Sequence, residues 1–74
     1  MMTTDEMKNK LHELAIQWSR EEDWGKACDI EREIWVLGEN YEERVGRYCI
    51  FVRTDSEMNF VAFKIDGVEF PRLA

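Results

Sequence analysis

The chain has 74 residues, of which 45% are hydrophobic and 35% charged, and its formal net charge is −6 at pH 7. This length allows one domain, residues 1–74, and the apolar and aromatic content argues against intrinsic disorder. The negative charge disfavours direct binding to nucleic acid or to an anionic membrane surface. The longest apolar runs, 34–37 and 49–52, are far shorter than a membrane span.

The opening segment and the cysteines indicate the cellular compartment. The first ten residues, MMTTDEMKNK, mix acids and lysines without an apolar core, so we expect no signal peptide. Cys28 and Cys49 lack CxxC spacing and a secretory context. We therefore interpret them as reduced thiols and predict a cytoplasmic protein.

The first predicted helix covers residues 4–20. Thr3 and Glu6 have the spacing of a capping box, in which each side chain bonds to the backbone N–H of the other residue. Beyond them, apolar side chains recur at helical spacing and form one stripe. The members of this stripe are Met7, Leu11, Leu14, Ala15 and Trp18.

The second predicted helix covers residues 24–37. Asp23 is a favourable N-cap, and Gly38 is a natural left-handed residue after the helix. The apolar side chains cover about half of its circumference, which indicates burial against both the first helix and a sheet. They are Trp24, Ala27, Cys28, Ile30, Ile34, Trp35 and Leu37.

Glu31 falls inside this apolar arc. An unpaired buried carboxylate is strongly disfavoured, so Glu31 should reach solvent or meet an arginine. Arg44 and Arg47 are the expected partners, because the following linker should return near the second helix.

Beyond Gly46 the hydrophobic period changes to two, which predicts strands at about 46–54, 58–65 and 68–71. Asp66-Gly67 is a strong type I′ hairpin signal. It places Ile65 opposite Val68. The predicted fold class is α+β, with an N-terminal antiparallel helical hairpin packed on a three-stranded antiparallel β-meander (ααβββ).

Residues 11–37 also carry a recognisable pattern. The relevant positions are Leu11 and Ala15 in the first helix and Asp23, Trp24, Lys26, Ala27, Cys28, Ile30, Glu33, Ile34 and Leu37 in the second. Together they resemble the UVR motif, a short helical hairpin of excision-repair nuclease subunits and several unrelated regulators. That motif typically has Arg-Asp in place of Glu31-Arg32 and two small residues in place of Trp18-Ser19. The resemblance covers 27 of 74 residues and implies protein–protein contact without catalytic chemistry.

Catalytic and metal chemistry find little support in these residues. A Cys–His nucleophile would need His12, the one histidine, beside a cysteine and a third orienting group. Asp29, Glu31 and Glu33 are spaced by two, so a helix spreads them apart rather than around one ion. No phosphate-binding glycine loop or nucleophile motif is present. We expect no enzyme activity, catalytic residue, metal or cofactor.

Negative charge is concentrated in the middle of the chain. Residues 21–43 hold nine acids and two bases, whereas residues 1–20 are neutral and residues 44–74 carry +1. This acidic belt is either a solvated helix exterior, the usual role of such runs, or a patch for a basic protein surface. Its members, expected to be exposed together around the turn and exit of the hairpin, are Glu21, Glu22, Asp23, Glu39, Glu42 and Glu43.

The outer face of the sheet is a second candidate surface. Strand alternation predicts that Tyr48, Ile50, Val52, Val61, Phe63, Ile65, Val68 and Phe70 face the helices. It predicts that Cys49, Phe51, Met58, Phe60 and Ala62 face away, bordered by Arg47, Arg53 and Lys64. Apolar patches with polar rims mark interfaces, with Arg47, Phe51, Arg53, Phe60 and Lys64 as the partner-binding residues here. The alternative is that residues 71–74 or the 39–46 linker cover this face.

These observations favour a small acidic, non-enzymatic module that binds another protein, as a regulator or inhibitor. In size and charge the chain is similar to the accessory proteins of phages and mobile elements. One alternative is a nucleic-acid mimic that blocks the basic groove of a nucleic-acid-binding protein. Another is a homo-oligomeric structural protein, such as a homodimer joined through the sheet. The expected partner is a protein, with a basic surface if the acidic belt is used.

Overall fold

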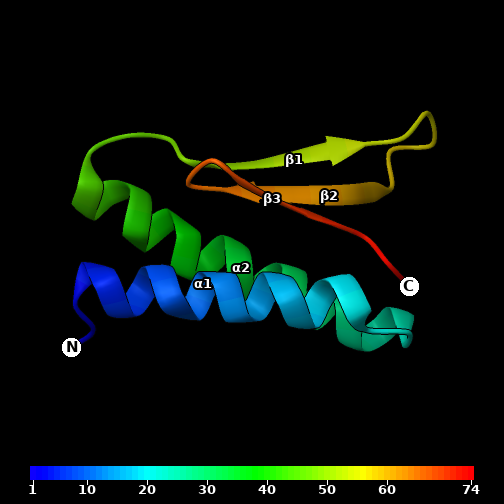
Figure 1. The fold of residues 1–74 in the computed structure, drawn as a ribbon, viewed down its shortest axis with the longest axis horizontal. Coiled ribbons are helices and arrows are strands. Elements are labelled where there is room, and N and C mark those ends of the chain that lie inside the picture. Colours follow the sequence, from blue (N-terminus) through cyan, green and yellow to red (C-terminus); the bar gives the residue numbers. More distant parts are fainter.

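A computed structural model describes all 74 residues. The elements are α1 (Thr4–Arg20), α2 (Trp24–Val45), β1 (Ile50–Thr54), β2 (Phe60–Ile65) and β3 (Val68–Pro71). The helices form a hairpin that covers one face of an antiparallel sheet of order β1-β2-β3 (Figure 1). The predicted ααβββ arrangement is confirmed. Neither helix combines the length and apolar character needed to cross a membrane.

Helix α1 forms as its sequence predicts. Thr3 and Glu6 make both hydrogen bonds of the capping box, and the predicted apolar stripe is buried. Trp18, the last member of this stripe, is fully buried, with its ring 4.8 Å from that of Phe63 in an edge-to-face arrangement. The side of α1 that faces the sheet therefore provides much of the core.

Helix α2 is longer than predicted. It begins after the expected N-cap, Asp23, but continues through Gly38 to Val45. A Cβ on Gly38 would lie 3.0 Å from Cδ1 of Ile50, so this glycine allows β1 to approach the helix closely. The glycine that ends α2 is Gly46, which is left-handed with φ of 76°. The prediction that α2 ends at residue 37 is wrong because Gly38 serves packing rather than termination.

Strand β1 consequently starts later than predicted, at Ile50 instead of about residue 46. The backbone N–H groups of Cys49 and Ile50 both donate to the carboxylate of Glu42, at 2.9 and 3.1 Å. Residues 47–49 thus lie in a connector outside the strand. Tyr48 is 85% exposed and is not buried against the helices, contrary to the prediction, although it borders the last turns of α2.

The hairpin between β2 and β3 matches its prediction. Asp66 and Gly67 have φ of 51° and 87°, as a type I′ turn requires, and Ile65 pairs with Val68. Phe63 pairs with Phe70, one register position along.

The face assignment fails at a β-bulge. The pairing passes from Arg53–Ala62 to Thr54–Phe60, so Val61 has no partner in β1. The extra residue reverses the alternation. Phe60 therefore turns toward the helices, with its ring 6.4 Å from that of Trp35.

Three further residues differ from the prediction in their face or in their burial. Cys49 is buried in the core cluster although it was predicted to face away. Val68 is exposed although it was predicted to face the helices, because it lies beside the hairpin turn. Ala62 is buried despite its position on the outer face.

Glu31 is not an isolated charge, but its partner is neither predicted arginine. The indole N–H of Trp18 donates to Glu31 at 2.9 Å across the helical hairpin. Arg44 instead donates to the backbone of Met2, and Arg47 pairs with Asp66. The half-buried carboxylate of Glu31 thus provides the hydrogen-bond acceptor that the buried indole N–H of Trp18 needs.

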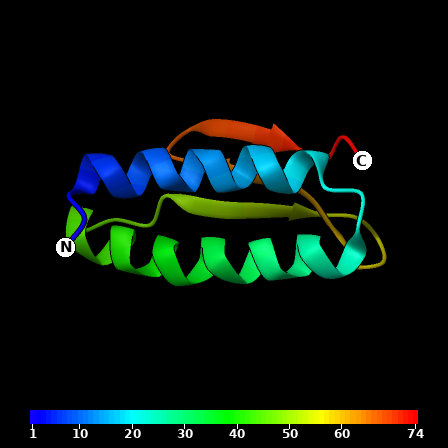
Figure 2. The ribbon, with the colours of Figure 1, turned by 90° about the horizontal axis from the view of Figure 1, so that it is seen from below.

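The sheet is displaced sideways over the helices. In Figure 2, β3 lies beyond α1, β1 lies between the two helices, and α2 lies outside β1. The free edge of β1 therefore runs above a helix that extends past the sheet.

Candidate functional site

The predicted acidic belt is divided between the two ends of α2. Because α2 has 22 residues and each advances the helix by about 1.5 Å, its ends are roughly 33 Å apart. The group 21–23 precedes its first turn, while Glu39, Glu42 and Glu43 occupy its last turns. The expectation of one shared surface is wrong because the two groups lie at opposite ends of α2.

The acidic residues before the first turn of α2, Glu21, Glu22 and Asp23, mostly make contacts within the protein. The carboxylate of Asp23 caps α2 by accepting from the N–H of Lys26 at 3.0 Å. The carboxylate of Glu21 accepts from the N–H of Asp23, and its backbone carbonyl accepts from Arg72. Only the carboxylate of Glu22 has no hydrogen-bond or ion-pair partner in this group.

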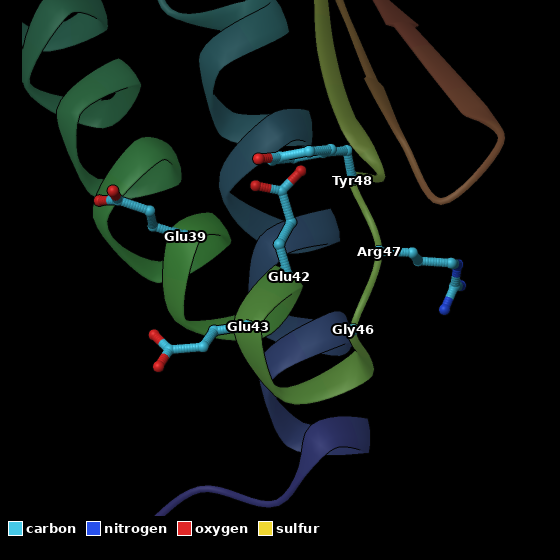
Figure 3. Close-up of a pocket in the computed structure, with 6 residues that line it drawn as sticks. All are labelled: Glu39, Glu42, Glu43, Gly46, Arg47 and Tyr48. Carbon is cyan, nitrogen blue, oxygen red and sulfur yellow. The ribbon is translucent and has the colours of Figure 1, made fainter.

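The acidic residues in the last turns of α2, Glu39, Glu42 and Glu43, include two carboxylates without a protein partner. Glu42 is committed to the N–H groups of Cys49 and Ile50, but Glu39 and Glu43 make no hydrogen bond or ion pair. In Figure 3 both point away from the helix, while Arg47 lies on the other side of the connector. Arg47 therefore does not neutralise the negative charge of Glu39 and Glu43.

Arg47 is held instead by Asp66 at the tip of the β2–β3 hairpin. Asp66 also accepts from the hydroxyl of Tyr41 at 2.9 Å and lies 3.4 Å from the ammonium of Lys8. Hydrogen bonds from Tyr41 and then Arg47 hold the pKa of Asp66 below its ordinary value. The hydrogen bond and the charge of Asp66 in turn raise the pKa of Arg47.

A concavity of about 480 Å³ lies between the last turns of α2 and the connector to β1 (Figure 3). Its lining includes Glu39, Glu42, Glu43 and Tyr48. Arg47 also lines it, but its guanidinium is paired with Asp66. Small-molecule sites of this size are mostly apolar, whereas only one hydrophobic side chain lines this one. Its chemistry therefore suits a cationic group.

An aromatic groove continues from this concavity along β1. Its lining residues are Trp35, Glu39, Glu42, Tyr48, Ile50 and Phe51. Trp35, Tyr48 and Phe51 are 37%, 85% and 53% exposed. We call the concavity and this continuation the α2–β1 groove. It combines exposed aromatic surface with unpaired carboxylates.

The backbone of β1 is open along this groove. The N–H of Asp66 donates to the carbonyl of Cys49, which makes Cys49–Asp66 a hydrogen-bonded position of the ladder. Such positions alternate in antiparallel pairs, so Val52, opposite Phe63, is not bonded to β2. Its N–H and C=O therefore point away from the sheet, and β1 has no neighbour on that side.

The outer sheet face is less apolar than predicted. Phe51 is its exposed aromatic residue, because Phe60 faces the helices. Arg53 pairs with Glu69 at 3.1 Å, which joins the two edge strands across the central one. The remaining two predicted residues are separate, since Lys64 is exposed on this face while Arg47 binds Asp66.

Neither predicted cover lies over this outer face. The 39–46 segment is part of α2 and its cap, on the other side of the sheet. Leu73 and Ala74 donate backbone N–H groups to the carbonyl of Ser19, so the last residues close the end of α1. Arg72 also donates to the carbonyls of Trp18 and Glu21, and its guanidinium lies 5.1 Å from the Trp18 ring centre.

The predicted site lacks four residues that line the groove: Trp35, Gly46, Tyr48 and Ile50. Trp35 was assigned to the core and Tyr48 to the inner sheet face because both fit apolar periodicities. The available signal was the excess width of the apolar arc on the second helix, since an arc wider than its packing partner leaves side chains exposed.

The titratable groups considered for catalysis have packing roles. The His12 ring lies 5.4 Å from the ring of Phe70 in a tilted arrangement, its Nε2 is buried without a partner, and no hydrogen bond joins it to a cysteine. Burial, followed by the charges of Asp66 and Glu42, raises the pKa of the Cys49 thiol and makes it a poor nucleophile. No group of three or more His, Cys, Asp or Glu residues is placed to hold a metal ion.

Comparison of the chain with protein families, with curated proteins and with solved structures finds no match.

Proposed function

We propose that this protein is a small, non-enzymatic module of the cytoplasm that binds another protein through the α2–β1 groove. The observation that carries the proposal is the open edge of β1, together with the exposed aromatic side chains of Trp35, Tyr48 and Phe51 beside it. Exposed strand edges readily pair with another chain, and aromatic side chains are enriched at protein interfaces. A regulator or inhibitor acts by such binding alone.

The UVR-type resemblance supports the same class of function, because it implies protein–protein contact. The two departures from that motif lie against each other, since Trp18 donates a hydrogen bond to Glu31. Both belong to the interior of the hairpin rather than to the α2–β1 groove. They therefore leave the proposed binding surface unaffected.

Nucleic-acid mimicry has weaker support. A mimic needs carboxylates distributed along one surface, whereas the two acidic groups are separated by the length of α2. Of the six carboxylates in those groups, Glu21, Asp23 and Glu42 are hydrogen-bonded within the protein.

Affinity capture with matched variants tests the proposed function. The tagged protein and its Tyr48→Ser/Phe51→Ser variant would be incubated with native lysate, and bound proteins quantified by mass spectrometry. The control is Ile16→Ser/Val36→Ser, which also removes two exposed apolar side chains but lies outside the groove.

We expect specific partners to be lost with the groove variant and retained with the control. Circular dichroism would establish that both variants fold. Retention of every partner by a folded groove variant would contradict the proposal.

A further inference from the structure

We infer, on the basis of the proposed function, that the partner supplies an extended basic segment that pairs with β1 as a fourth strand. In the direction antiparallel to β1, its pattern is apolar-x-basic-x-basic. The apolar residue lies over Trp35, and the basic residues meet Glu39 and Glu43.

The backbone of β1 sets the position of the added strand. The free N–H and C=O of Val52 bond to one residue of the segment, whose side chain then faces the helices, as that of Val52 does. At the start of β1 the N–H of Ile50 is already occupied by Glu42, so pairing is centred on Val52. The other edge of the sheet is less suitable, because β3 has only four residues and ends in Pro71.

The spacing of side chains on α2 fits such a segment. Trp35, Glu39 and Glu43 are four residues apart, which corresponds to about 6 Å along a helix. Alternate residues of a strand are about 6.8 Å apart. β1 runs antiparallel to α2, since Gly38 contacts Ile50 whereas Trp35 contacts the partners of Val52 and Thr54. A segment antiparallel to β1 therefore passes Trp35 first, then Glu39 and Glu43.

The negative charge of α2 favours a basic segment over a second copy of the chain at the free edge of β1. Glu39 and Glu43 have no cationic partner in the protein, and basic side chains of a bound segment would supply one. A second copy joined through β1 would instead bring two α2 helices together. Each carries six acidic and three basic residues, so they would repel each other.

Titration with a synthetic peptide tests the inference. The probe is acetyl-Thr-Val-Thr-Lys-Thr-Arg-Thr-amide, and one control carries glutamate in place of its lysine and arginine. A second control keeps every side chain but is N-methylated at valine, which removes the backbone donor to Val52. Binding would be followed by calorimetry and by hydrogen exchange of the Val52 amide.

We expect the probe to bind and to slow exchange at Val52, and each control peptide to bind at least about tenfold more weakly, or about 1.4 kcal/mol. Among protein variants, Glu39→Lys should weaken binding about tenfold, while Glu22→Lys, with the same charge change at the far end of α2, stays within about twofold. The difference should shrink at high salt.

Several results would overturn the inference. Equal binding of the N-methylated peptide would exclude strand addition, and equal binding of the glutamate peptide would exclude a basic segment. Protection of Val52 by self-association of the free protein would identify a second copy as the occupant. If no peptide binds while capture from lysate still depends on the groove, this inference fails and the proposed function stands.

Discussion

The two helices bury their residues to different extents. α1 has 17 residues and buries six, whereas α2 has 22 and buries only four. α1 contacts α2, β2 and β3, and the last residues of the chain cover its end. α2 supports the core along one side and leaves Trp24, Trp35 and Val36 exposed.

This difference follows from the sideways placement of the sheet. Because the sheet lies over α1 and the space between the helices, α2 has no cover beyond β1 (Figure 2). Changes on the buried side of α1 should therefore lower stability, whereas changes on the exposed side of α2 should leave stability nearly unchanged. Among the exposed α2 residues, those that line the α2–β1 groove should act on binding. The following predictions test this division, beginning with the largest effect.

Replacement of tryptophan gives the most direct test. Trp18→Ala should lower the free energy of unfolding by about 3–5 kcal/mol, because it leaves a large cavity in the core. Trp24→Ala removes the same side chain from α2, where it is 65% exposed, and should cost within about 0.5 kcal/mol. Urea denaturation followed by circular dichroism would compare them, and similar costs would contradict the division.

Asp66 joins the two helices to the hairpin through Lys8 and Tyr41. Asp66→Asn should cost about 1.5–3 kcal/mol at pH 6, since it removes charged hydrogen bonds while Asn-Gly preserves the turn. The folded-state pKa of Asp66 is lowered, so its stabilisation is complete above the unfolded pKa of about 3.9 and is lost as the pH falls through the folded value.

The stability difference between wild type and Asp66→Asn should accordingly shrink as the pH is lowered from 6 to about 3. Thermal denaturation at a series of pH values would measure it. A difference that stays constant with pH would mean that the Asp66 charge does not stabilise the fold.

Two adjacent glutamates distinguish a structural carboxylate from a free one. Glu42→Ala should cost about 1–3 kcal/mol, because it leaves the N–H groups of Cys49 and Ile50 without their acceptor. Glu43→Ala should change stability by less than about 0.5 kcal/mol, because its carboxylate has no partner. Equal effects in urea denaturation would assign the two side chains the same role.

Of the changes at packed or hydrogen-bonded positions, Gly38→Ala should have the smallest effect, a loss of about 1 kcal/mol. Alanine improves helix propensity by about 1 kcal/mol, but its Cβ would lie 3.0 and 3.2 Å from two carbons of Ile50, and such overpacking costs more. Ile50→Val removes the nearer carbon, so a double-mutant cycle should show favourable coupling. Greater stability of Gly38→Ala alone would show that β1 can move away from α2.

The sequence determined the elements and much of the core through signals that act over a few residues. Thr3 and Asp23 cap the helices as predicted, the spacing from Met7 to Trp18 defines a buried stripe, and Asp66-Gly67 forms the expected turn. Capping, helical periodicity and turn conformation depend on neighbours along the chain, so they can be inferred without knowing the tertiary arrangement.

Tertiary structure alone decided which glycine ends α2 and which aromatic residues remain exposed. Gly38 and Gly46 offer the same local signal, but Gly38 packs against Ile50 within the helix and the left-handed Gly46 ends it, so Glu39, Glu42 and Glu43 belong to its last turns. Similarly, Trp35 fits the apolar arc, but the position of β1 leaves it at the border of the groove. Contacts between elements distant in sequence fix these outcomes, because a helix or strand pattern states which side is apolar but not how far its partner covers it.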